Sequence, residues 1–205
     1  MITVTMPRGP QDLRIKHFKA MAHIPDSGFK ISDNTLLFLA DFLGLTYNQT
    51  LDFRTRDIRK MTDIAVKAIG KMDLTSNLPE KIVLGKEKFV RVDPEKIGIG
   101  WHIDFSNSSI TKDPVRLACL FYVQEGFNYS DVDQNGNIVF PISSRYDLFE
   151  QEFPLDLFIR SANFFLKRSL NSMKMSTVQE IIQSRTKNRI VLFLKSLNLF
   201  SGKLQ

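Results

Sequence analysis

The chain has 205 residues, of which 43% are hydrophobic and 24% are charged, and its formal net charge is +6. This length and composition belong to an ordinary folded protein with a real core, and they argue against global disorder. A single cysteine, Cys119, excludes an internal disulfide framework, and no stretch reaches the roughly 18 apolar residues that a membrane span needs.

The charge is distributed unevenly along the chain. Residues 151–205 contain nine Lys or Arg and three Asp or Glu, a surplus of +6, whereas residues 1–150 contain 19 of each sign. The basic carboxy-terminal third could therefore meet a nucleic acid, an acidic protein or no specific partner. The amino terminus lacks the basic start and apolar run of a signal peptide, so we expect a protein of the cytoplasm.

Helices are predicted to dominate residues 10–75. Before them, residues 2–5 (ITVT) indicate a short strand. Residues 11–22 have apolar positions at helical spacing, and residues 32–43 form a second helix that Ser32 or Asp33 caps and Gly44 ends.

Residues 54–72 give the clearest amphipathic pattern of this region. The apolar positions are Ile58, Met61, Ile64 or Ala65, Ala68 and Met72. The opposite face carries Arg56, Arg59, Lys60, Lys67 and Lys71. Such a charged face is usually solvated, and a binding role is the alternative.

Residues 81–142 are predicted to be rich in strands. Residues 81–92 indicate a hairpin about Gly85, residues 97–105 alternate apolar and other residues with period two, and residues 115–123 are apolar on both faces, as in a central strand. The expected fold class is α+β in one domain, 1–205, with amino-terminal helices, a mostly antiparallel central sheet and carboxy-terminal helices over 145–200.

The stretch DVDQNGNIVFPI, residues 131–142, begins like a calcium-binding loop. Asp131, Asp133 and Asn135 alternate and a glycine follows, but the twelfth position is Ile142 instead of the bidentate Glu that such loops use. Asn-Gly before the β-formers NIVF favours a two-residue hairpin turn. A weak surface metal site is the alternative.

Enzymatic signatures are sparse. The chain has no phosphate-binding glycine loop and no zinc-binding pattern of His or Cys. His102 and Asp104 would share one face of the predicted strand at 97–105, where an acid–base pair is conceivable and a polar outer face is the simpler interpretation. Cys119 in an apolar strand is expected to be inert. We therefore expect no catalysis, no cofactor and no metal, with a small enzyme as an alternative.

The carboxy-terminal helices provide the predicted contact surface. Residues 154–170 form an amphipathic helix, and residues 183–189 are polar before a very apolar run. An apolar helix face with a basic rim suits contacts between a helix and a groove, and burial of the same phenylalanines within the monomer is the alternative. The predicted partner-binding residues are Phe158, Phe164, Lys167, Arg168, Arg185, Lys187, Arg189, Phe193 and Phe200. The same cations make nucleic-acid binding the second hypothesis, and self-association into a homo-oligomer is a further alternative.

Three segments together resemble the T4-type phage baseplate protein family. They are IGIGWHIDF (97–105), LACLFYVQEGFNYSDVDQNGNIVFPIS (117–143) and SSRYDLFEQEFPLDLFIRSANFFLKRS (143–169). The resemblance implies a non-enzymatic tail protein, made in the host cytoplasm, that is either retained in the virion baseplate or acts as an assembly factor on hub or tape-measure proteins. It supplies no individual functional residues.

Overall fold

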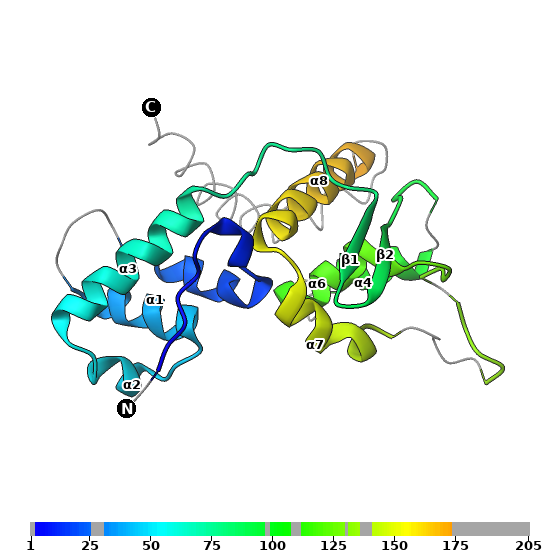
Figure 1. The fold of residues 1–205 in the computed structure, drawn as a ribbon. Coiled ribbons are helices and arrows are strands. Elements are labelled where there is room, and N and C mark those ends of the chain that lie inside the picture. The colour runs from blue at the N-terminus through cyan, green and yellow to red at the C-terminus, as the bar shows by residue number, and fades with distance from the viewer. Residues whose placement is uncertain are drawn as a thin grey trace. The chain divides into compact units, whose positions relative to one another are not determined.

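The computed structural model describes residues 3–25, 31–96, 99–107, 112–129, 131–135 and 141–173. These residues form an α+β fold in which helices precede and follow a three-stranded antiparallel sheet (Figure 1). The predicted fold class is confirmed. The chain divides into two compact units, Met1–Ala162 and Asn163–Gln205, and the boundary falls within α8 (Leu155–Met173). Of the second unit the structure describes residues 163–173, where Phe164 and Phe165 meet edge to face at 5.2 Å.

Two short-range signals define the helix α1 (Asp33–Leu43). The Ser32 side chain accepts a hydrogen bond from the Thr35 N–H at 3.4 Å, so Ser32 is the N-cap that the sequence predicted. Gly44 ends the helix with φ 67°, a left-handed conformation that glycine adopts without steric cost. The short helix α2 (Tyr47–Leu51) follows, and α1 packs against it.

The predicted amphipathic helix is α3 (Thr55–Gly70). Its buried residues are Ile58, Met61, Ala65, Ala68 and Ile69. This stripe recurs every three or four residues and faces the core, and α3 packs against α1. The pattern at 54–72 is confirmed, with the helix two residues shorter at its end.

The amino-terminal segment differs from the prediction. Residues 3–5 belong to no strand, which makes the predicted ITVT strand wrong over its described part. The expected helix at 11–22 is two 3-10 helices, η1 (Pro10–Asp12) and η2 (Ile15–His23). Between them the backbone pairs with a distant segment, because the Ile15 N–H donates to the Phe153 carbonyl and the Leu155 N–H donates to the Leu13 carbonyl.

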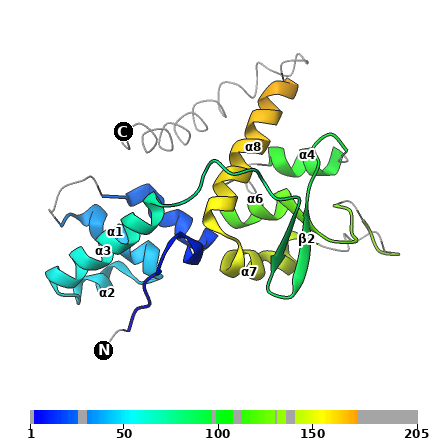
Figure 2. The same ribbon diagram turned by 45° about the horizontal axis from the view of Figure 1, so that its top comes forward.

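The sheet has the order β1-β2-β3, with β1 (Lys81–Leu84), β2 (Glu87–Arg91) and β3 (Tyr122–Gln124). β1 and β2 form the hairpin predicted at 81–92, with Leu84 opposite Glu87. The turn begins at Gly85 with φ 57°, the position where a two-residue hairpin needs glycine. Figures 1 and 2 show α6 (Pro114–Phe121) and α7 (Ile142–Glu152) beside this hairpin, and α7 contacts β1.

The strand predicted at 97–105 is wrong, because residues Ile99–Ser106 form the helix α4. A period-two pattern contains pairs four residues apart, and a helix brings such pairs together as well. Trp101 and Phe105 are one such pair and stack at 4.8 Å, while Ile103 between them is 61% exposed. The Trp101 indole N–H donates to the Leu120 carbonyl at 2.8 Å, which attaches α4 to α6.

The strand predicted at 115–123 is mostly wrong. Residues Pro114–Phe121 form the helix α6, and only the next residues enter β3. Asp113 begins the helix, since its carboxylate accepts hydrogen bonds from the Val115 and Arg116 N–H groups. Pro114 occupies the first helical position, where its missing N–H costs nothing. A run that is apolar on every side cannot distinguish a buried helix from a buried strand.

An aromatic core joins the sheet to α7 (Ile142–Glu152) and to Phe153 at its carboxy-terminal end. The Phe149 ring meets Phe89 of β2 edge to face at 5.0 Å and stacks on Phe153 at 5.1 Å. Tyr122 of β3 lies 5.7 Å from Phe153. All four side chains are essentially inaccessible to solvent. The helix predicted at 154–170 is confirmed, with Pro154 immediately before it.

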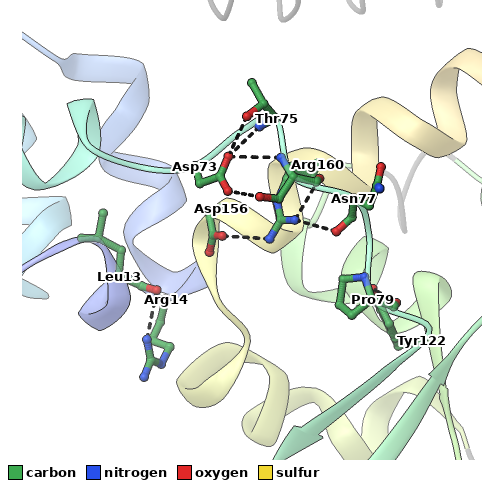
Figure 3. Close-up of polar contacts among 10 residues, drawn as sticks. Leu13, Arg14, Asp73, Thr75, Asn77, Pro79, Tyr122, Asp156 and Arg160 are labelled. Carbon is green, nitrogen blue, oxygen red and sulfur yellow. Dashed lines mark hydrogen bonds and ion pairs between the residues drawn. The ribbon is translucent and has the colours of Figure 1, made fainter.

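Arg160 of α8 holds the connector between α3 and β1 (Figure 3). Its guanidinium donates to the carbonyls of Ser76 and Asn77 and to the Asp156 carboxylate, each at 3.0 Å. Further along, the Tyr122 hydroxyl donates to the Pro79 carbonyl at 3.0 Å. At the start of the connector, Asp73 accepts hydrogen bonds from the backbone N–H groups of residues 75 and 76, which fixes a tight turn.

We expect Phe149→Ala to lower the free energy of unfolding by about 3–5 kcal/mol, because it leaves a cavity between two aromatic rings. Leu51→Ala is the matched control, since Leu51 is 55% exposed on α2 and its truncation should change the value by about 0.5 kcal/mol or less. Urea unfolding followed by circular dichroism measures both. Equal effects of the two substitutions would contradict this description of the core.

Candidate functional site

The predicted partner-binding residues of α8 have different environments. Phe158 is 2% exposed and lies edge to face with Phe18 at 5.0 Å, so it belongs to the core and cannot serve the contact surface that the sequence predicted. Phe164 is half-buried and meets Phe165. Lys167 and Arg168 lie on α8, and their side chains are outside the described part. The remaining predicted residues, Arg185, Lys187, Arg189, Phe193 and Phe200, lie outside the described residues.

The acidic loop at 131–135 uses its carboxylates for local turns. Asp131 accepts a hydrogen bond from the Asn128 N–H at 2.7 Å, and Asp133 accepts one from the Asn135 N–H at 2.8 Å. Among the described residues, no group of three or more His, Cys, Asp or Glu side chains is placed to hold a metal ion. The predicted Asn-Gly hairpin falls on residues 136–140, which lie outside the described residues.

The sequence candidates for catalysis are dispersed. His102 and Asp104 are two positions apart on the helix α4, which removes the shared strand face that suggested an acid–base pair. The Asp104 carboxylate instead accepts a hydrogen bond from the Tyr129 hydroxyl. Cys119 is fully buried, and desolvation raises the pKa of its thiol to about 12. A thiol with that pKa is protonated at neutral pH and is a poor nucleophile.

Arg145, on the first turn of α7, is a buried cation without an acidic partner among the described residues. Its side chain is 2% exposed, and neither Nε nor Nη1 has a hydrogen-bond partner. Burial lowers the pKa of the guanidinium, and the nearby Cys119 and Tyr129 offset part of this shift. A buried charge with unsatisfied donors is costly for the folded state.

A groove opens between α3, the corner that follows α2, and the amino-terminal segment. Its volume is about 770 Å³. The apolar lining consists of Val4, Met6, Phe53, Met61 and Ile64. The charged lining consists of Asp52, Arg54, Asp57 and Lys60, all exposed. The groove is open to solvent, and its apolar floor could accept apolar side chains of a partner.

The α3 side of the groove follows from helical spacing. Asp57, Lys60, Met61 and Ile64 occupy positions i, i+3, i+4 and i+7, so they lie along one flank of the helix. This flank lies between the buried stripe and the opposite, basic face. Met61 is 7% exposed and belongs to both the core and the groove floor. The two methionines at the groove are flexible side chains that adapt to differently shaped partners.

The basic face of α3 borders the groove and is largely unneutralised. Residues 54–71 contain six basic and two acidic residues, a net charge of +4. Lys67 pairs with Asp63 at 2.7 Å. Within the described part of the chain, no ion pair engages the other five cations, which are Arg54, Arg56, Arg59, Lys60 and Lys71. This surface, which we call the α3 surface, therefore combines the groove with exposed positive charge.

The basic face of α3 was predictable from the sequence, and the segments that complete the groove were not. The predicted basic residues of the face are exposed, namely Arg56, Arg59, Lys60, Lys67 and Lys71, and their binding role stays a prediction. Val4, Met6 and Phe53 carried no periodic signal, and no local pattern could have placed them beside α3. The burial of Arg145 was also missed, because nothing in the sequence of α7 marks that position as internal.

We expect Arg145→Met to raise the free energy of unfolding by about 1–3 kcal/mol, because an apolar side chain of similar length removes a buried charge that has no acidic partner among the described residues. Arg145→Lys is the control: it keeps the charge and should not stabilise the protein. Thermal and urea unfolding of the purified variants measures both effects. A clear loss of stability in Arg145→Met would show that the guanidinium has a partner on which the fold depends.

The described part of the chain contains no helix that is long and apolar enough to cross a membrane. The chain matches no family model, no curated protein and no solved structure.

Proposed function

We propose that the chain is a structural or assembly protein of a contractile phage tail baseplate, and that it works through contacts with other proteins. The observation that carries the proposal of a binding role is the α3 surface. It offers an apolar groove of about 770 Å³ beside exposed cations that have no acidic partner within the described residues. The baseplate assignment rests on the resemblance of residues 97–105 and 117–169 to the T4-type family.

The chemistry of the described side chains supports a binding role over catalysis. The buried thiol of Cys119 is protonated at neutral pH, and Asp104 is engaged by the Tyr129 hydroxyl. His17 is also committed to the fold, since its ring nitrogen accepts from the Arg14 N–H at 2.8 Å and burial lowers its pKa. None of these groups lines the groove, whose polar residues are two carboxylates and two cations.

Nucleic-acid binding is the second candidate function. The net charge of +6 over residues 151–205 and of +4 over residues 54–71 favours it, because clustered cations release counterions from a phosphate backbone. Asp52 and Asp57 at the groove disfavour it there, since they would face the phosphates. A binding constant that falls steeply with salt, for any sequence of duplex or single strand, would identify this function.

Co-purification tests the proposed function. The full chain is co-expressed with the products of the genes that flank its own, and the purified complex is identified by mass spectrometry. We expect a baseplate hub or tape-measure protein to co-purify with the wild-type chain. Capture of no tail protein, with flanking genes that encode none, would overturn the baseplate assignment.

Substitutions at the groove test where the partner binds. We expect Val4→Asp and Ile64→Asp to reduce recovery of the tail protein at least about tenfold, because each puts a charge into an apolar contact. Val83→Asp is the matched control, since Val83 is 64% exposed on β1 and does not line the groove. Loss of the partner in the control but not in the groove variants would place the contact elsewhere.

A further inference from the structure

The groove and the basic face of α3 together define the chemistry of what would bind there. We propose that the α3 surface binds an acidic amphipathic helix of a partner protein, an inference that rests on the proposed function and specifies the partner. The apolar side chains of that helix enter the groove, and its carboxylates meet the cations of α3. Neither the groove nor the basic face alone would identify the partner. A solvated row of cations is common on protein surfaces, and an apolar groove accepts many ligands.

The groove determines the apolar part of the partner. Val4, Met6, Phe53, Met61 and Ile64 offer an apolar floor, and the α3 flank extends over positions i to i+7, which is about 10 Å of helix. A partner helix repeats its own apolar residues at i, i+3, i+4 and i+7, so its apolar face matches the length of this flank. The flexible Met6 and Met61 let the floor adapt to such a face.

The cations determine the charge of the partner. Arg56 and Arg59 lie on the exposed face of α3, and Lys60 lies where this face meets the groove. Arg56 lies one helical turn before Lys60, so a carboxylate on the polar side of a helix in the groove lies near these two cations, whereas Arg59 faces away from the groove lining. Arginine binds carboxylates through two parallel hydrogen bonds, and no ion pair among the described residues engages Arg56.

The acidic residues of the groove distinguish a protein partner from a nucleic acid. Asp52 and Asp57 are exposed in the lining, between the apolar floor and the solvent. A continuous phosphate backbone would bring negative charge against both of them. A helix avoids this repulsion by placing apolar, neutral or basic residues opposite them, and its acids opposite Arg56 and Lys60.

Synthetic probes test the inference with the full chain. The first probe is a labelled peptide of about 18 residues with Leu at i, i+3, i+4 and i+7 and Glu on its other face. The second has the same composition in scrambled order, the third has Lys in place of Glu, and the fourth is a short DNA duplex. Fluorescence anisotropy at low and high salt gives the four dissociation constants. We expect the first probe to bind at least tenfold tighter than each of the others and to weaken as salt rises.

Variants of the chain locate the binding site. We expect the double substitution Arg56→Glu and Lys60→Glu to weaken binding of the acidic amphipathic peptide at least tenfold, and Val4→Asp to weaken it similarly. The matched control is Lys86→Glu with Lys88→Glu, which makes the same charge change at two exposed residues of the hairpin. The control should retain wild-type affinity apart from a small long-range effect that salt removes.

Four results would overturn the inference. They are absence of peptide binding, equal binding of the scrambled acidic peptide, tighter binding of the DNA duplex, and equal losses in the hairpin control. Co-purification of a tail protein that depends on the groove, together with any of these results, would leave the proposed function standing and refute only the acidic helix as the occupant.

Discussion

The buried stripe of α3 fixes the rotation of this helix about its axis, and the candidate site depends on that rotation. Ile58, Ala65 and Ala68 are at most 5% exposed, so turning the helix by one position would expose them and bury cations. Burial of the stripe therefore holds Arg56 and Arg59 in solvent and places Met61 at the edge of the groove. The same residues that stabilise the amino-terminal helices present the charged and apolar parts of the α3 surface side by side.

The rest of the first unit is organised around aromatic contacts and a few long-range hydrogen bonds. Phe149 joins the sheet to α7, and Trp101 joins α4 to α6 through the Leu120 carbonyl. Arg160 fixes the connector that leads from α3 to the sheet, using backbone carbonyls as acceptors (Figure 3). Arg145 contrasts with Arg160, because it is buried without comparable acceptors. The buried guanidinium of Arg145 lowers the stability of the folded state. It also keeps a polar group close to Tyr129 and Cys119.

Local signals made α1, α3 and the β1–β2 hairpin predictable from sequence. Ser32, Gly44 and Gly85 act within a few residues of their own positions, and the α3 stripe repeats over 16 residues. The helices α4 and α6 were predicted as strands because their patterns fit both structures. Contacts between distant residues decided the outcome, as the hydrogen bond from Trp101 to Leu120 shows. The groove required three separate segments to meet, so only its α3 flank could be predicted, and Phe158 was assigned to a surface although its ring is internal.

In the proposed function, this chain holds another polypeptide on the α3 surface. Hydrogen exchange of the full chain, alone and in complex with the tail protein proposed as its partner, is the direct test. We expect slower exchange in the complex over residues 55–70 and over residues 3–7, with little change in the β1–β2 hairpin. Slower exchange confined to the hairpin or to α7, with α3 unchanged, would contradict it.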